Sequence, residues 1–277
     1  MAVDRGRGRL LVGAGLVSLF AAGTLLAPWL APFDPTQVPA SLAQTMLRPP
    51  GSAHVLGTDA LGRDLLSRVL HGGRVSLAIG VGVEAIAAAI GIALGLLAGY
   101  HGGWRDGALM RFTDVVMAFP SLILAIGLIA VFERPGLDKV AVVLAALGWT
   151  TIARVVRGEV LSVKERDFVQ AARALGTPDA LLMARHVLPN VAGPVIVTAT
   201  IGVGSNMVAE AGLSFLGLGA QAPTISWGSM LAEGQTFLAS APWVAVFSGL
   251  ALMLAVLGVN LLGDGLRDRL DPRLRRG

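Results

Sequence analysis

The sequence contains no cysteine and few charged residues, and both shortages narrow what the protein can be. Without cysteine the chain forms no disulfide, no zinc finger and no thiol nucleophile. Only 14% of its 277 residues are charged, whereas a soluble domain carries about 25%. With 54% hydrophobic residues and a mean hydropathy of +0.71, the composition predicts an integral membrane protein.

The sequence also lacks the residue patterns that several kinds of chemistry require. Lys139 and Lys164 are the only lysines, and neither stands in the G-x-x-x-x-G-K-[ST] frame of a phosphate-binding loop. The four histidines are scattered without metal-ligand spacing, so we expect no metal site. Gly212 stands two residues before Ser214, but Leu216 replaces the trailing glycine of a nucleophile turn, which disfavours a membrane-embedded enzyme, and we expect no catalytic residue. The net charge of +4 comes without an aromatic-rich basic face, so we expect no nucleic acid partner.

Six apolar runs are candidates for crossing a bilayer, which takes about 20 residues. They cover residues 10–30, 75–100, 110–132, 140–156, 191–212 and 243–262. The first run could instead be a cleaved signal peptide, but its length and the lack of a small-residue cleavage site before Pro28 favour a retained span. We therefore predict an all-α membrane protein with six transmembrane helices.

The distribution of positive charge predicts the orientation, because Lys and Arg favour the cytoplasmic side of short loops. With the N-terminus inside, sixteen of the 22 Lys and Arg residues fall on cytoplasmic segments. The six on the outer side are Arg48, Arg63, Arg68, Arg74, Arg134 and Lys139. Both termini are thus expected in the cytoplasm.

The runs divide the chain into four parts. Residues 1–32 form the N-terminal tail and first span, and residues 33–74 form an extracytoplasmic loop. In that loop, apolar residues recur at helical spacing from Leu61 to Leu70, which predicts an interfacial amphipathic helix. We expect residues 75–265 to form the core membrane domain, with five spans and a cytoplasmic loop at about 157–190, and residues 266–277 to form a basic cytoplasmic tail.

Glycine and polar residues within the apolar sequence indicate contacts inside protein. Gly91, Gly95 and Gly99 form a doubled G-x-x-x-G, which predicts close packing against another helix. Residues 213–241 are rich in Gly and Ser, and such backbone cannot face lipid, so it must be buried in protein or line a water-filled cavity.

Ionisable residues in the spans need a partner or a cavity, because a charge at the bilayer centre costs about 2.5–3.5 kcal/mol. We expect Glu84 and Glu210 to line a translocation path or a seam between subunits, and we group Asn206 with them. For Asp114, near the cytoplasmic end of its run, both an interfacial ion pair and a role in the path remain open.

A charged island at residues 168–190 interrupts the apolar sequence. Gly176 tolerates the left-handed conformation that ends a helix, and Thr177 as N-cap with Pro178 at the first helical position is expected to begin another. A polar helix-turn-helix between two spans has no lipid to bury against. The island therefore predicts a docking surface for another protein.

Four segments together resemble the membrane subunits of ABC importers, specifically the C-type permease of dipeptide, oligopeptide and nickel systems. They are residues 56–68 with 74–77, the island 168–190, residues 213–219 with Pro223 and 226–228, and residues 260–273. The likeness runs from about residue 10 to residue 273.

Within this likeness, the island resembles the family's EAA loop, whose pattern is E-A-A, three residues, G, nine residues, I-x-L-P. Gln170 stands in place of the Glu, which removes a possible ion pair with the ATPase, and His186 stands in place of the Ile. The residues that fit are Ala171, Ala172, Gly176, Leu188 and Pro189.

The resemblance implies a permease of the type I ABC importer kind, a multi-pass protein of the bacterial inner or plasma membrane. It implies a heterodimer with a B-type permease and one or two cytoplasmic ABC ATPases, which bind ATP and Mg while this chain binds no cofactor. An extracytoplasmic solute-binding protein would deliver the substrate. The implied ATPase-docking residues are Phe168, Gln170, Ala171, Ala172, Arg173, Leu175 and Gly176.

The substrate remains open at this stage. Di- or oligopeptides are the first choice, and nickel or a nickel chelate imported by the same mechanism is the alternative. A self-contained secondary transporter or channel is the alternative of another class. It is disfavoured because the sequence shows no internal repeat and such a carrier has no use for the docking island.

Overall fold

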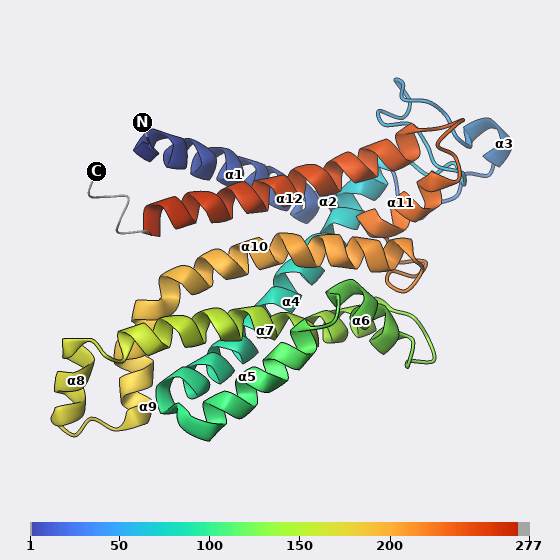
Figure 1. Ribbon diagram of the computed structural model, residues 1–277. Helices are drawn as coiled ribbons and strands as arrows, with labels where there is room; N and C mark the ends of the chain where they lie inside the picture. Colours follow the sequence, from blue (N-terminus) through green and yellow to red (C-terminus); the bar gives the residue numbers. More distant parts are fainter. Residues whose placement is uncertain (1, 271–277) are drawn as a thin grey trace.

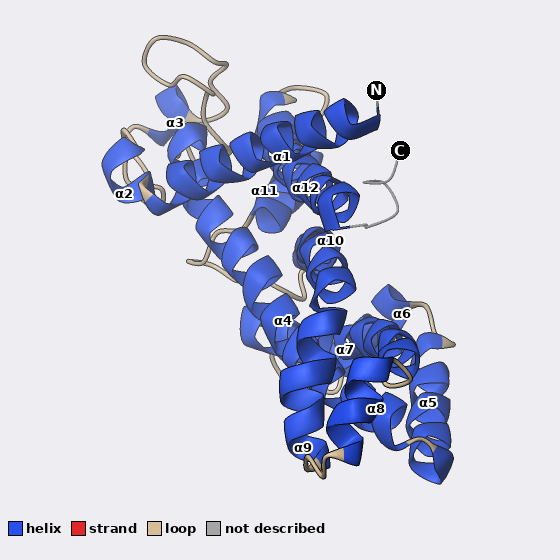
Figure 2. Cartoon of the chain, turned by 90° about the vertical axis from the view of Figure 1, so that its left-hand side faces the viewer, coloured by secondary structure: helices blue, strands red, loops and turns tan. Residues whose placement is uncertain are grey.

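The computed structural model describes residues 2–270, and within them every regular element is a helix (Figure 2). The long helices are α1 (Ala2–Leu25), α4 (Leu65–His101), α5 (Gly103–Met117), α7 (Leu137–Val163), α10 (Leu188–Phe215) and α12 (Trp243–Leu270). The short elements are α2 (Ala27–Leu30), α3 (Leu42–Thr45), α6 (Ser121–Ile129), α8 (Asp167–Ala174), α9 (Asp179–Leu182), the π-helical turn η1 (Met183–Val187) and α11 (Trp227–Gln235).

Six membrane spans are present if one of them is counted as broken. Among the described residues, five helices are long and apolar enough to cross a membrane, and α5 with α6 makes the sixth, bent by 86°. The predicted fold class is therefore confirmed, but the prediction of one continuous helix from the run 110–132 is wrong. Pro120 precedes α6 and disfavours helical backbone at Phe119, so the chain turns there.

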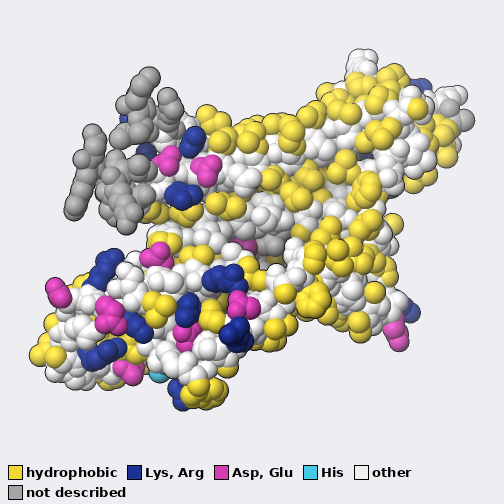
Figure 3. Space-filling model, viewed as in Figure 1, with side chains coloured by type: hydrophobic (Ala, Val, Ile, Leu, Met, Phe, Trp, Pro, Cys, Tyr) yellow, Lys and Arg dark blue, Asp and Glu magenta, His cyan; other side chains and the backbone are white. Residues whose placement is uncertain are grey.

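The chain ends and the coupling loop lie at the same end of the molecule (Figure 1). Helix α1 begins at this end and α12 finishes there, and α8 and α9 project from it. Charged side chains gather over this end, whereas hydrophobic side chains cover much of the remaining visible surface (Figure 3). This common location agrees with the predicted cytoplasmic placement of all three features. The basic residues Arg273, Arg275 and Arg276 of the predicted tail lie outside the described residues.

Helices α4 and α7 approach closely along the predicted glycine face. A Cβ added at Gly91 would lie 2.6 Å from the Cβ of Ile152, and one added at Gly95 would lie 2.7 Å from the Cβ of Val156. At Gly99 the corresponding distance, to the Cβ of Val160, is 2.9 Å. No side chain fits at these three positions without moving α7, which confirms the prediction of close helix packing.

The loop between α1 and α4 differs from its prediction. The predicted interfacial helix at residues 61–70 is wrong, because residues up to Asp64 are loop and Leu65 begins the long helix α4. The side chain of Asp64 caps this helix by accepting a hydrogen bond of 2.8 Å from the amide of Ser67. Leu65 and Arg68, which lie on the same face of the helix, are each 1% exposed, so protein covers this face of the first turn.

The glycine pair that follows explains why α4 continues. A Cβ on Gly72 would lie 3.3 Å from Ile225, and one on Gly73 would lie 2.6 Å from the ring of Trp227. These glycines therefore permit close packing and do not end a helix. As a result, α4 starts ten residues earlier than the predicted span at residue 75.

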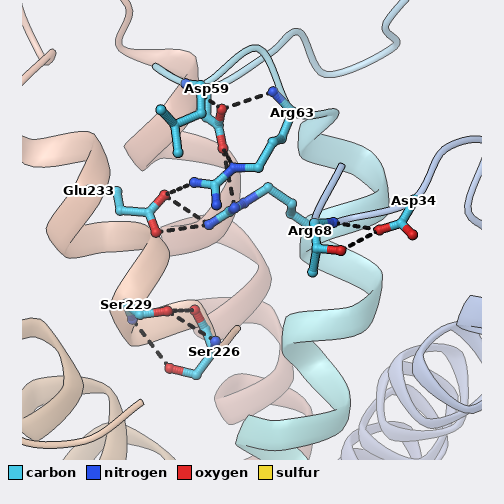
Figure 4. A network of polar contacts seen from close by, with 9 residues as sticks. Asp34, Asp59, Arg63, Arg68, Ser226, Ser229 and Glu233 are labelled. Carbon is cyan, nitrogen blue, oxygen red and sulfur yellow. Dashed lines mark hydrogen bonds and ion pairs between the residues drawn. The ribbon is translucent and has the colours of Figure 1, made fainter. Parts of the chain in front are cut away.

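Helix α11 fills the segment between the last two spans, and its buried face confirms the prediction for that part of residues 213–241. Ser226 caps it in a capping box with Ser229 (Figure 4). Trp227 is fully buried. The indole of Trp227 donates a hydrogen bond of 2.9 Å to the carbonyl of Val69 in α4. Residues 221–224, in contrast, are exposed.

An ion-pair network ties the outer loop to α4 and α11 (Figure 4). Arg63 contacts Asp59 at 2.7 Å and Glu233 at 3.0 Å. The buried Arg68 contacts Glu233 at 2.8 Å and Asp59 at 3.3 Å. Two carboxylates thus compensate the charge of Arg68, as a buried arginine requires.

We expect Gly95→Ala to destabilise the protein. The added methyl group would overlap the carbonyl oxygen of Ala153 and the side chain of Val156, and such overpacking typically costs about 1–3 kcal/mol. The measurement is the midpoint of thermal unfolding in detergent. Gly82→Ala on the same helix is the matched control, because a Cβ at Gly82 meets nothing within 4 Å. Equal midpoints for the two variants would contradict the proposed role of the glycine face.

Candidate functional site

The coupling loop folds as two short helices joined by a glycine turn. Helix α8 ends at Ala174, and Gly176 has a φ of +81°, in the left-handed region predicted for it. The amide of Gly176 donates to the carbonyl of Arg173 at 2.9 Å, and the amide of Thr177 donates to the carbonyl of Ala172 at 3.2 Å. These paired bonds form a Schellman motif, in which glycine avoids the penalty of left-handed backbone.

The start of the second helix, α9, differs from its prediction. Thr177 was predicted as the N-cap, but Pro178 occupies that position and no side chain caps α9. The amide of Thr177 is already used in closing α8, so the residue belongs to the end of the first helix. We call residues 168–176, which comprise most of α8 and the glycine turn, the hook, and α9 follows it at Asp179.

One side of α8 is anchored in the protein. Val169 is fully buried in a core cluster with Val163 and Leu182, and Ala172 packs against this cluster. The side-chain amide of Gln170 donates a hydrogen bond of 2.9 Å to the carbonyl of Lys164. The Gln that replaces the Glu of the EAA pattern therefore fastens the helix to the end of α7.

The other side of α8 is exposed. Phe168 is 41% exposed and Leu175 is 87% exposed, and Ala171, Arg173 and Gly176 are exposed beside them. Five of the seven docking residues named from the sequence thus lie at the surface, while Gln170 and Ala172 are half-buried. Large apolar side chains exposed at the tip of a projecting element are typical of a surface that another protein covers.

Polar contacts connect this hook to the end of α4, and the sequence did not predict them. The guanidinium carbon of Arg173 lies 5.3 Å from the ring centre of Tyr100, in a cation–π contact. The hydroxyl of Tyr100 donates a hydrogen bond of 2.6 Å to Asp179 in α9. The ammonium of Lys164 donates to the carbonyl of Gly99 at 2.9 Å. Tyr100 is the sole tyrosine of the chain, and this was the feature of the sequence that could have pointed to it.

A cavity of about 570 Å³ lies among α4, α6, α7 and α10. Its lining is mainly apolar, with a few polar side chains, as in sites that bind small molecules. The polar lining residues are Glu84, Ser121, Thr150, Thr151, Thr198, Ser205 and Asn206. Glu84 and Asn206, both named from the sequence as path residues, therefore come together at this cavity.

Within the cavity the amide of Asn206 donates a hydrogen bond of 2.8 Å to Glu84. Gly202 leaves the space for this carboxylate, because a Cβ at that position would overlap it. The side chains come from antiparallel stretches of α4 and α10. On α10 they belong to a stripe with four-residue spacing that the sequence displays: Thr198, Gly202, Asn206, Glu210 and Ser214.

Glu210 and Asp114 do not line this cavity. Glu210 is fully buried and accepts hydrogen bonds from Ser76 at 3.0 Å and Ser214 at 2.7 Å. It connects α4 to α10, so we assign it to the packing of those helices and not to a path. Asp114 forms an ion pair of 2.7 Å with Arg154, and both side chains are about half exposed, which is the interfacial alternative considered for it.

Comparison with known proteins identifies the family. The family of binding-protein-dependent transport system inner membrane components matches residues 91–276. The chain belongs to this family. It is accordingly a multi-span inner-membrane protein and the non-catalytic permease subunit of an ATP-driven ABC importer that works with a binding protein.

Individual relatives are similar along most of the chain. The dipeptide transport system permease protein DppC of Alkalihalophilus pseudofirmus is 42% identical over 89% of this chain and 82% of its own length. The glutathione transport system permease protein GsiD of Pectobacterium atrosepticum is 43% identical over 97% and 89%. A putative peptide transport system permease of Brucella suis is 41% identical over 95% and 88%.

A solved structure shows the same fold. A chain of the MetNI methionine ABC transporter in an inward-facing conformation superimposes with a TM-score of 0.60 at 18% identity. The match covers 73% of this chain and 96% of that chain. The permease architecture predicted from the sequence is thereby confirmed.

We expect Glu210→Ala to destabilise the protein, since it would leave the hydroxyls of Ser76 and Ser214 without their acceptor inside the helix bundle. An unsatisfied buried polar group costs about 1–3 kcal/mol. The measurement is again thermal unfolding in detergent. Glu133→Ala, at an exposed position, serves as the control, and Glu210→Gln, which retains an acceptor oxygen, should fall between the two. An unchanged midpoint for Glu210→Ala would exclude the assigned packing role.

Proposed function

We propose that this permease imports short peptides, forming the path with a B-type permease and receiving the motion of cytoplasmic ATPases through α8. The similarity to permeases named for dipeptide, glutathione and peptide transport, at 41–43% identity over at least 89% of the chain, carries the choice of substrate. Glutathione is itself a short peptide, so the relatives agree on the class of cargo.

The hook supplies the proposed ATPase contact. Its exposed apolar side chains, Phe168 and Leu175, are suited to a cleft on a partner, and Arg173 adds a positive charge next to them. Gln170 is engaged with the carbonyl of Lys164, so it supports the surface from behind. The contact with the ATPase accordingly rests on apolar packing and Arg173, without the carboxylate of the EAA pattern.

A route for motion leads from the hook into the membrane. The contacts of Tyr100 with Arg173 and Asp179 connect α8 and α9 to the end of α4. Helix α4 then continues without a break to Glu84 in the cavity. A displacement of the hook on ATP binding would thus move α4 and the cavity wall together.

The test of the substrate is uptake into proteoliposomes that contain the complete importer, with its solute-binding protein supplied outside. We expect ATP-dependent uptake of a labelled dipeptide and tight binding of peptides to the solute-binding protein. Uptake of nickel or a nickel chelate with no uptake of peptides would replace the proposed substrate with its alternative. Uptake that needs no ATPase would overturn the proposed mechanism.

We expect Gly176→Val to uncouple ATP hydrolysis from import while leaving the subunit inserted and assembled. A non-glycine residue in left-handed backbone costs roughly 1–2 kcal/mol, so the turn would rearrange and misplace the docking surface. Transport per ATP hydrolysed should fall about tenfold, the equivalent of about 1.4 kcal/mol.

The control for this variant is Gly158→Val, because Gly158 lies within α7 and a Cβ there meets nothing within 4 Å. Co-purification of the ATPase reports assembly for both variants. Wild-type transport per ATP by Gly176→Val would show that the turn has no part in coupling.

A further inference from the structure

We propose that Glu84 is a binding site for a primary ammonium group of the cargo as it passes through the permease. This inference rests on the proposed function, because it assigns a contact to a peptide in the path. It starts from what surrounds the carboxylate of Glu84 in the cavity between α4 and α10.

The carboxylate has a hydrogen-bond donor but no cation among the described residues. Its hydrogen-bond partner is the side-chain amide of Asn206, at 2.8 Å from Oε2. The lining of the cavity, as far as the structure describes it, includes no Lys, Arg or His. Asp106 and Asp114 pair with arginines, Arg157 at 2.5 Å and Arg154 at 2.7 Å, and Glu210 is held by the hydroxyls of Ser76 and Ser214 away from the cavity.

An unpaired carboxylate within the membrane region is costly, and such a residue is by default a candidate for function. Glu84 is only 6% exposed, so water does little to stabilise its charge. The fold nevertheless provides for the carboxylate at this place, since Gly202 leaves room for it and Asn206 orients it. Within the described part of the chain, the cavity lacks a positive charge to pair with this carboxylate, and a positively charged cargo would supply one while it occupies the cavity.

A short peptide brings such a charge. Its α-amino group is protonated near neutral pH, since its pKa is about 7.7–8.0. The cavity of about 570 Å³ lies within the range of about 300–1,000 Å³ of small-molecule sites. Hydroxyls of Thr150, Thr151 and Ser205 lie in the same lining and can accept or donate hydrogen bonds to the peptide backbone. The geometry therefore suits a small zwitterion whose ammonium end meets Glu84.

The cavity also reaches the surface of the isolated chain. Phe119 is 57% exposed, Leu122 is 43% exposed, and Ser205 is exposed on α10. A partner permease packed on this side would close the cavity and complete the path. Glu84 would then face cargo that moves along the seam between the two subunits.

The first experiment measures the charge preference of the cavity without requiring transport. Because the chain has no cysteine, Ser205→Cys creates a single reporter thiol in this subunit. Its rate of modification by a cationic methanethiosulfonate, the ethyltrimethylammonium reagent, is compared with that by the anionic ethylsulfonate reagent in the assembled importer. Mass spectrometry of the intact subunit reads the modification.

We expect the ratio of cationic to anionic rates to fall about fivefold or more when Glu84→Gln is added, because a nearby carboxylate attracts cations strongly at the low effective dielectric of such a site. Glu84→Asp, which keeps the charge, should preserve most of the preference. Asp138→Asn removes a carboxylate at the start of α7, 72% exposed and paired with Lys139, and should leave the ratio unchanged. An unchanged ratio in Glu84→Gln would overturn the proposal.

The second experiment measures uptake of two dipeptides, Ala-Ala and Ala-Lys, by the reconstituted importer at saturating solute-binding protein. Loss of one partner of a buried charge pair weakens binding strongly, so Glu84→Gln should lower uptake at least about tenfold. A fall for both dipeptides assigns the contact to the N-terminal ammonium. A fall for Ala-Lys alone assigns it to the lysine side chain. Wild-type uptake of both would overturn the proposal.

Two further measurements separate the causes of failure. Gly202→Ala places a methyl group where the carboxylate lies, so it should reduce uptake of the same dipeptides even though Glu84 is retained. It serves in place of Glu84→Gln if that variant does not assemble with the partner subunits. If the wild-type importer takes up no peptide, the proposed function fails, and the labelling ratio still decides whether the cavity selects cations.

Discussion

The close contact between α4 and α7, made where Gly91, Gly95 and Gly99 carry no side chain, is the constraint on which the working parts of this permease depend. In lipid, helices gain little from burying apolar surface against one another, so association relies on close packing and polar contacts. This contact fixes the C-terminal half of α4, and the hook is attached to that half through Tyr100. The N-terminal half of α4 is held separately, by Ser76 to α10 and by Trp227 of α11.

Because α4 is held along its whole length, it can transmit motion as a rigid body. Glu84 and Tyr100 are sixteen residues apart on this helix, which corresponds to about 24 Å at a rise of 1.5 Å per residue. Under the proposed mechanism, movement of the hook would reach the cavity through this one continuous helix. The break between α5 and α6, in contrast, lies beside the cavity, where Met117 and Phe119 form part of its wall.

The sequence alone predicted the features that depend on local chemistry. The apolar runs, the glycine face of α4 and the left-handed turn at Gly176 follow from hydrophobicity, spacing and the conformational freedom of glycine. Features set by distant neighbours were not predictable in this way. Residues 61–70 have helical spacing, but their burial depends on α11, more than 150 residues further along the chain, as the hydrogen bond from Trp227 to Val69 shows. The prediction of Thr177 as an N-cap failed for a different reason. Thr177 could either begin α9 or close α8, and its amide closes α8 by donating a hydrogen bond to the carbonyl of Ala172.

The same distinction explains why four polar residues named together as path candidates have different roles. Each satisfies the rule that a polar group in a membrane needs a partner, but the rule does not say which partner. Glu210 meets two hydroxyls from its own bundle, and Asp114 meets Arg154, so both are satisfied within the subunit. A carboxylate satisfied by its own chain is held in place and contributes to the packing of the helices. Glu84 has the amide of Asn206 and an open cavity beside it, so it retains the capacity to accept hydrogen bonds from a group that is not part of the protein.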